Sequence, residues 1–257
     1  MWKLFLDDYS DKRLSDYPLM GNCSTLIGIV ACYLLFVLKL GPAMMKNRPA
    51  FNLRTVLLVF NAVQIIMCLY IITMIVKTIP LNAFTCMTNQ TTSPSDLVLL
   101  NVSYLYWVIK LIDLFDTIFF VLRKKFTQIS TLHVYHHTLM VSVGWIINKY
   151  YPAGELVWLG LLNSIVHVFM YFYYFCAVMF DGKITIWWKK YITQAQILQF
   201  ITLGTIYTIK LFDSTCEYPK GMLVFHLGQV SLLCYMFVNF YYNAYIKQKK
   251  TTIKKVD

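Results

Sequence analysis

Charged residues are scarce in this chain of 257 residues. Only 14% are Asp, Glu, Lys or Arg, and 58% are hydrophobic, whereas a soluble domain has roughly 25% charged and about 45–50% apolar residues. Most of the surface must therefore face something other than water, and a lipid bilayer meets that condition. The first twenty residues are too acidic and too polar for a cleaved signal peptide. We therefore expect the first apolar segment to insert and to stay in the membrane.

Cysteines are too few for a disulfide-rich scaffold, with seven in a chain of this length. Four lie inside apolar runs, where a small buried hydrophobe is the expected role: Cys32, Cys68, Cys176 and Cys234. Internal repeats and long linkers are not evident in the sequence either. We therefore expect residues 1–257 to form a single domain.

Apolar runs long enough to cross a bilayer recur along the whole chain. A transmembrane helix needs about 20 mostly apolar residues to cross roughly 30 Å of hydrocarbon. The sequence predicts seven such helices, at residues 24–39, 56–79, 97–122, 132–147, 156–180, 191–212 and 222–245. The fold class is then an all-α membrane protein, with a short segment 1–23 before the first span and a tail 246–257 after the last.

The distribution of Lys and Arg predicts the orientation of these spans. Most of the basic residues lie in alternate loops and in the tail 246–257, and this side should be cytosolic, with segment 1–23 in the lumen. The net charge of +11 is then mostly this bias and not a sign of nucleic-acid binding. Lys254 and Lys255 resemble a dilysine signal for return to the endoplasmic reticulum, although a plain basic tail at a membrane surface would look similar.

Other features agree with this orientation. Asn22 and Asn89 each begin a glycosylation sequon, and both fall on the predicted lumenal side. Cys86 and Cys216 lie in two different loops on the same oxidising side. A disulfide between them is plausible, and two free thiols are the alternative.

Polar and ionisable residues in four consecutive spans are grouped, not scattered. They are Lys110, Asp113, Asp116 and Thr117 in span 97–122, His133, His136 and His137 in span 132–147, Asn163, His167, Met170, Tyr171 and Tyr174 in span 156–180, and Thr193, Gln196 and Gln199 in span 191–212. Each set falls on one helical face, and ionisable residues at membrane depth usually mark function or buried pairing. Four such helices would enclose a polar chamber.

Simpler roles are available for some members of these sets. Lys110 and Asp113 could form an ion pair that neutralises itself, and Thr193, Gln196 and Gln199 could bridge helices by hydrogen bonds. Three histidines within one turn are harder to explain by packing. A histidine cluster could bind a metal, but this chain offers few other ligands, so a metal-dependent membrane oxidase or hydroxylase stays the alternative.

Acyl transfer without a metal is the other chemistry that the cluster permits. A neutral imidazole is a good nucleophile toward a thioester. A long acyl chain suits a site at hydrocarbon depth, and an anionic carrier such as coenzyme A suits a basic cytosolic surface. The candidate residues for that surface are Arg123, Lys124, Lys125, Lys183, Lys189 and Lys190. A non-catalytic lipid transporter is a third possibility.

Four motifs, in order and at the expected spacings, resemble those of the ELO family, the very-long-chain fatty acid elongases. They are KLIDLFDT from Lys110, HVYHH from His133, NSIVHVFMYFYY from Asn163 and TQAQILQ from Thr193. The resemblance implies a 3-oxoacyl-CoA synthase of the endoplasmic reticulum that condenses an acyl-CoA with malonyl-CoA. It also implies six of the seven helices in a ring around an acyl tunnel. The family usually has Glu at the position of Asp113.

The resemblance also implies roles for individual residues. His136 would carry the acyl group as an acyl-imidazole, and His167 would assist decarboxylation. His133, His137 and Asp116 would position the reacting imidazole. The residues expected to hold substrate or CoA are Lys110, Asp113, Asn163, Tyr171, Tyr174, Gln196, Gln199, Lys183 and Lys189. We expect no metal or cofactor beyond the two CoA substrates, and the other enzymes of the elongation cycle are the expected partners.

Overall fold

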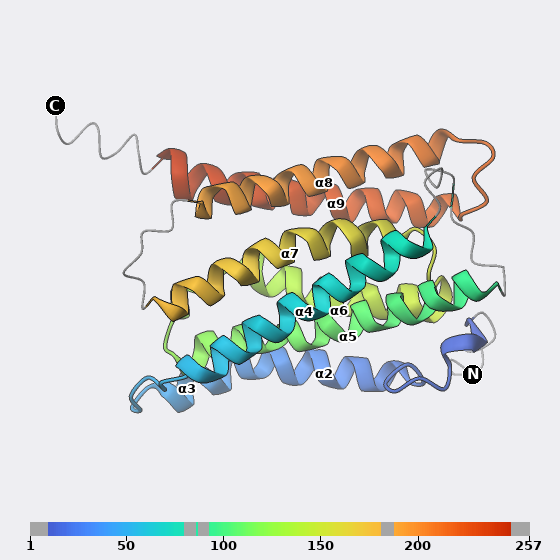
Figure 1. Ribbon diagram of the computed structural model, residues 1–257. Coiled ribbons are helices and arrows are strands. Elements are labelled where there is room, and N and C mark those ends of the chain that lie inside the picture. Colours follow the sequence, from blue (N-terminus) through green and yellow to red (C-terminus); the bar gives the residue numbers. More distant parts are fainter. Residues whose placement is uncertain (1–9, 80–85, 87–92, 181–187, 248–257) are drawn as a thin grey trace. The chain divides into compact units, whose positions relative to one another are not determined.

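The structure is a computed structural model that describes residues 10–79, 86, 93–180 and 188–247. Within these residues the chain folds into helices and contains no strand (Figure 1). The long helices are Cys23–Met45, built from α2 (Cys23–Leu35), η2 (Phe36–Leu40) and α3 (Gly41–Met45), then α4 (Arg54–Thr78), α5 (Pro94–Leu122), α6 (Thr131–Tyr150), α7 (Leu156–Met179), α8 (Lys189–Phe212) and α9 (Lys220–Tyr241), which η4 (Tyr242–Lys247) continues. Short 3-10 turns are η1 (Lys12–Leu14) and η3 (Phe126–Gln128). The prediction of seven helices is confirmed.

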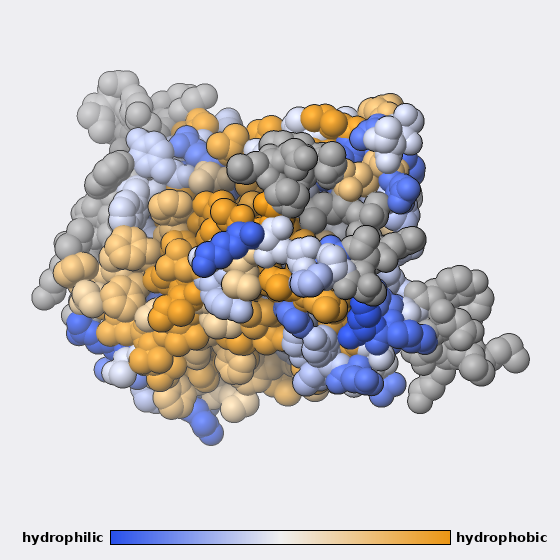
Figure 2. Space-filling model, turned by 45° about the vertical axis from the view of Figure 1, so that its right-hand side comes forward, coloured by the Kyte–Doolittle hydropathy of each residue, from blue (hydrophilic) through white to orange (hydrophobic). Residues whose placement is uncertain are grey.

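Five of the long helices have the length and composition of membrane spans. These are Cys23–Met45, Arg54–Thr78, Val157–Met179, Lys189–Phe212 and Lys220–Lys247. Apolar side chains cover wide areas of the surface in Figure 2, as expected where the solvent is lipid. The chain is therefore a multi-pass membrane protein. The two long helices outside this set, α5 and α6, carry the buried ion pair and the histidine cluster described below.

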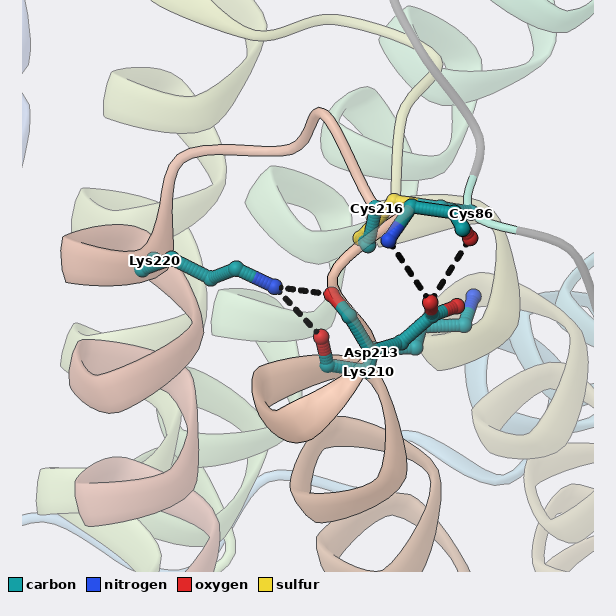
Figure 3. The surroundings of a disulfide bond; sticks show 6 residues. Cys86, Lys210, Asp213, Cys216 and Lys220 are labelled. Atoms are coloured by element: carbon teal, nitrogen blue, oxygen red, sulfur yellow. Dashed lines mark hydrogen bonds between the residues drawn. A yellow bond between two sulfur atoms is a disulfide. The ribbon is translucent and has the colours of Figure 1, made fainter.

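A disulfide constrains the number of membrane crossings. Cys86 and Cys216 are joined, with a Cα–Cα distance of 5.0 Å and 130 residues between them (Figure 3). Two bonded cysteines lie on the same side of a membrane, so an even number of crossings must separate them. The intervening helices are α5, α6, α7 and α8. Because α7 and α8 have the composition of spans, α5 and α6 must either both cross or both stay out, and both are long enough to cross.

Polar contacts close the loop that follows α8. Lys220 Nζ donates to the carbonyl oxygens of Lys210, at 2.9 Å, and Asp213 (Figure 3), and the Cys216 amide donates to the same Asp213 carbonyl at 3.3 Å. The Asp213 carboxylate accepts hydrogen bonds from the side chain and the backbone amide of Thr215. These two bonds lower the pKa of Asp213, because they favour its charged form. The loop is thus held in the shape that presents Cys216 to Cys86.

The described helices divide into two compact units. The first comprises residues 1–56 and 89–157 and contains α2, η2, α3, α5, η3 and α6, and the second comprises residues 57–88 and 158–257 and contains nearly all of α4 together with α7, α8, α9 and η4. The expectation of a single domain stays a prediction.

Apolar and aromatic side chains of α2, α5 and α6 build the core of the first unit. Trp107 is 1% exposed, and its indole nitrogen donates to the carbonyl of Val141 at 3.0 Å. Trp145 donates to the carbonyl of Leu19 at 2.9 Å and so attaches the segment before α2 to α6. Both bonds satisfy a polar indole group inside an apolar core, which would otherwise be costly.

The first span is longer than the sequence predicted. Residues 36–40 form a π-helical turn in which the Gly41 amide donates to the Phe36 carbonyl, five residues earlier. Pro42 has no amide hydrogen, so in a regular α-helix the carbonyl four residues earlier would lose its partner. The wide turn changes the hydrogen-bond register just before the proline, and the helix continues to Met45. The predicted end at residue 39 was therefore wrong.

Tertiary contacts also extend the fourth helix beyond its predicted end at residue 147. Asn148 is fully buried and accepts a hydrogen bond from Ser103 at 2.9 Å. Lys149 is 4% exposed, and its ammonium lies 3.4 Å from the Gly21 carbonyl oxygen. These polar residues end an apolar run in the sequence, but in the fold they have partners on α5 and before α2.

A lysine holds the end of α5 to the segment after α3. Lys124 Nζ donates to the carbonyls of Lys46, at 3.3 Å, and Arg48, at 3.0 Å. The Phe51 amide donates to the Leu122 carbonyl at 3.0 Å. Lys124 has a positive φ of 55°, which allows its side chain to turn back onto this segment at the end of the helix.

The second unit is held together by aromatic and polar contacts between its helices. Helices α8 and α9 pack along their length, with Phe200 and Phe237 ring centroids 5.1 Å apart. His226 is buried, stacks on Tyr207 and lies 3.3 Å from the Tyr218 hydroxyl. These are structural contacts between neighbouring elements, and they explain a buried histidine without a catalytic role.

The close approach of α5 and α6 at Gly144 gives a test of this packing. A Cβ at Gly144 would lie 2.9 Å from Cδ1 of Trp107, whose ring is fixed by its hydrogen bond to Val141. We expect Gly144→Ala to destabilise the protein by about 1–3 kcal/mol through overpacking. Gly28→Ala is the matched control, because nothing lies within 4 Å of that position. Thermal unfolding in detergent measures both, and equal melting temperatures would contradict the packing described.

Candidate functional site

The polar stripe predicted on α5 is buried inside the first unit. Lys110, Asp113, Asp116 and Thr117 are each 9% exposed or less. Lys110 Nζ lies 2.9 Å from Asp113 Oδ2, with side chains only 3% and 2% exposed, and Nζ also lies 5.0 Å from the centre of the Tyr106 ring. A buried charge is tolerated only when it is paired, and this pair meets that condition.

The three histidines of α6 form one cluster of rings. The centroids of His133 and His137 are 4.3 Å apart, and those of His136 and His137 are 5.5 Å apart with the rings nearly perpendicular. Their spacing of three and four residues places them on one face of the helix, as predicted. His137 is therefore the central ring of the cluster, in contact with both of the others.

A hydrogen-bonded chain links this cluster to α5 and α2. His133 Nε2 lies 2.8 Å from Thr117 Oγ1, and Thr117 Oγ1 lies 2.8 Å from the Tyr33 hydroxyl oxygen. Thr117 is fully buried, and Tyr33 is 6% exposed. Sequence reasoning found Thr117 but missed Tyr33, because Tyr33 stands alone in an apolar span and has no polar neighbour at helical spacing.

An apolar groove lies beside Tyr33 within the first unit. Its volume is about 430 Å³, and it is lined by Leu19, Ile29, Cys32, Tyr33, Phe36, Leu111, Leu114, Phe115 and Ile118. The Tyr33 hydroxyl is the polar end of an aromatic side chain that lines this apolar groove. This makes its bond to Thr117 the more favourable, since water does not compete strongly in such a place.

The second unit contains the remaining predicted histidine. His167 on α7 is 4% exposed, and its ring centroid lies 5.6 Å from that of Tyr171, which is fully buried. Gln64 on α4 is 1% exposed, and its Nε2 lies 3.5 Å from the Tyr171 hydroxyl. Asn61, one turn earlier, is also buried. Sequence reasoning missed Asn61 and Gln64, although their spacing of three residues was the signal that could have revealed them.

Other predicted residues of this unit lie on α7 and α8. Asn163 and Gln199 are 4% and 5% exposed. Tyr174 is half-buried, with its ring centroid 6.2 Å from that of Tyr171. Gln196 Nε2 lies 4.0 Å from the Met170 sulfur, a contact between α8 and α7. The polar faces of α7 and α8 are thus joined within the second unit, as the stripes suggested.

The predicted residues do not all fall within one described group. His133, His136, His137, Lys110, Asp113 and Asp116 belong to the first unit, and His167, Asn163, Tyr171, Tyr174, Gln196 and Gln199 belong to the second. A single chamber built from all four helices therefore stays a prediction. Among the described residues, no three His, Cys, Asp or Glu side chains are arranged to hold a metal ion.

Several predicted residues lie at the edges of the described chain or outside it. Lys189 is exposed at the start of α8, and Asn22 is exposed just before α2. Lys183, Asn89, Lys254 and Lys255 lie outside the described residues.

Comparison with known proteins gives a consistent result. Residues 18–253 match the family described as GNS1/SUR4 (ELO). Very long chain fatty acid elongase 7 of Drosophila melanogaster is 39% identical over 254 residues, covering 96% of this chain and 76% of that protein. Very long chain fatty acid elongase 5 is 37% identical in Rattus norvegicus and 36% in Homo sapiens, in each case over 93% of this chain and 80% of the relative.

The buried ion pair offers a test of the electrostatics on α5. Lys110→Met or Asp113→Leu alone leaves one charge buried without its partner, and we expect each to cost roughly 3–5 kcal/mol of stability. The double variant Lys110→Met/Asp113→Leu removes both charges and should recover much of that loss. Thermal unfolding of the three variants measures the coupling. Losses that simply add in the double variant would show that the two side chains do not depend on each other.

Proposed function

The chain belongs to the GNS1/SUR4 (ELO) family, and on that premise we propose that it is the condensing enzyme of a fatty acid elongation cycle. Its substrates would be malonyl-CoA and a long-chain or very-long-chain acyl-CoA, and its product a 3-oxoacyl-CoA that is two carbons longer. The observation that carries the proposal is the cluster of three histidines on α6, hydrogen-bonded to a buried polar face of α5. The names of the relatives support the same reaction class.

The proposed reaction has two stages. In the first, an imidazole nitrogen of His136 attacks the acyl thioester, the carbon–sulfur bond breaks, and CoA leaves as its thiol or thiolate. In the second, malonyl-CoA loses carbon dioxide, and the resulting enolate carbon attacks the acyl-imidazole. A carbon–carbon bond forms, the carbon–nitrogen bond breaks, and His136 is released. Covalent catalysis of this kind divides one difficult step into two easier ones.

The contacts within the first unit support a different role for each of its polar residues. His133 makes a hydrogen bond to Thr117 and its ring lies against that of His137, which suits a residue that orients its neighbours. His136 is at the end of the cluster, in contact with His137. Lys110 and Asp113 neutralise each other, so they keep the site polar without giving it net charge. Asp116 is buried on the same face and is proposed to orient a histidine.

The second unit is proposed to handle the CoA thioester. His167 would assist decarboxylation, and Asn163 and Tyr174 would hold the thioester end. Tyr171 is fully buried against His167 and Gln64 and would fix the His167 ring. Lys189 is exposed at the start of α8. It would contact the CoA phosphates, as Lys183 would.

The wider setting is also part of the proposal. We place the protein in the endoplasmic reticulum membrane with its N-terminus in the lumen and its C-terminus in the cytosol, and six of its helices around an acyl tunnel. The disulfide between Cys86 and Cys216 suits an oxidising lumenal side. A metal-dependent oxidase is not favoured, because the relatives are named elongases.

The nucleophile assignment gives a direct test. We expect His136→Ala to lower the rate of malonyl-CoA-dependent chain lengthening by about 10³-fold or more, as the loss of a catalytic nucleophile does in other enzymes. His226→Gln is the control, because His226 is a buried histidine bound to Tyr218 and Tyr207 in another part of the chain. Purified protein, labelled malonyl-CoA and acyl-CoAs of several lengths measure the rate. Undiminished lengthening by His136→Ala would refute the assignment.

A further inference from the structure

The hydrogen bonds that link α2 to α6 determine which atoms of the linked side chains carry the protons. This chain of hydrogen bonds runs from the Tyr33 hydroxyl to Thr117 Oγ1, and from Thr117 Oγ1 to His133 Nε2, with both distances 2.8 Å. A threonine hydroxyl has one proton, so it can donate to only one of these two partners and must accept from the other. The direction of the chain therefore decides which nitrogen of His133 carries hydrogen.

Thr117 does not use its proton on the helix backbone. Other threonines in the long helices, such as Thr73, Thr205 and Thr208, donate to the carbonyl four residues earlier. Within the described part of the chain, the Thr117 hydroxyl makes hydrogen bonds to Tyr33 and His133 alone. Its proton must then point toward one of them.

The buried Tyr33 hydroxyl sets the direction. Within the described residues Thr117 is its only hydrogen-bond partner, and the side chain is 6% exposed. If Thr117 donated to Tyr33, the Tyr33 proton would have no acceptor, which is costly for a buried group. If Tyr33 donates to Thr117 instead, Thr117 donates to His133 Nε2. Both hydroxyl protons then have an acceptor.

We propose that Tyr33 is a positioning residue that, through Thr117, holds His133 neutral in the tautomer with hydrogen on Nδ1. The inference rests on the proposed function for its catalytic meaning. In this tautomer the lone pair of His133 Nε2 is committed to Thr117. His133 then offers a donor, Nδ1–H, to substrate or to the neighbouring His137. His133 is thereby excluded as the acyl carrier, which leaves the other two histidines of the cluster.

The tautomer can be read by nitrogen NMR on the full-length protein, labelled with ¹⁵N-histidine and held in lipid nanodiscs. The signals of His133 are identified by their absence in His133→Gln. We expect a protonated Nδ1 and an unprotonated Nε2 in the wild type, and a mixture of both tautomers in Tyr33→Phe. A wild-type Nε2–H form, or a Tyr33→Phe spectrum identical to wild type, would overturn the proposal. These spectra need no turnover, so they decide the question even if the protein does not elongate acyl-CoA.

Kinetics give the second readout. Losing a neutral hydrogen bond of this kind should lower kcat roughly five- to tenfold with little change in KM. We expect this for Tyr33→Phe and for Thr117→Val, no further loss in the double variant, and recovery in Thr117→Ser, which restores the hydroxyl. Tyr104→Phe is the control, because it removes a tyrosine hydroxyl bound to the Pro18 carbonyl in the same unit. Wild-type kcat in Tyr33→Phe, or an equal loss in Tyr104→Phe, would contradict the assignment.

Discussion

The cost of burying polar groups away from water is the constraint on which the rest of this structure depends. An isolated charge or an unmatched donor is penalised where water is scarce. Lys110 is therefore paired with Asp113 at 2.9 Å, and His133 is bound through Thr117 to Tyr33. The same requirement places indole donors such as Trp107 on backbone carbonyls. Satisfying these groups fixes which faces of α2, α5 and α6 meet.

Pairing of this kind also prepares the chemistry. A histidine that is desolvated, neutral and held by a defined hydrogen bond can attack a thioester or orient a neighbour that does so. In the first unit the buried ion pair contributes no net charge, and the ring of His137 touches both His133 and His136. In the second unit His167 has a comparable support, with Tyr171 against its ring and Gln64 behind Tyr171.

Much of this arrangement could be predicted from the sequence, and the failures have physical causes. Runs of apolar residues identified all seven long helices of the described chain, five of which have the length and composition of membrane spans. Helix ends were less certain: the π-helical turn before Pro42 carries the first helix to Met45, a change of register that no composition rule contains. Tyr33 and Gln64 were missed because their importance comes from partners distant in sequence, Thr117 and Tyr171.

The proposed mechanism depends on the formation of an acyl-imidazole intermediate on His136. The most direct measurement is to mix purified enzyme with labelled acyl-CoA in the absence of malonyl-CoA, and then to locate the label by peptide mass spectrometry. We predict release of about one equivalent of CoA per enzyme, as expected for a covalent intermediate, and an acyl group on His136 that disappears when malonyl-CoA is added. No release of CoA without malonyl-CoA, or an acyl group on another residue, would contradict the proposed mechanism.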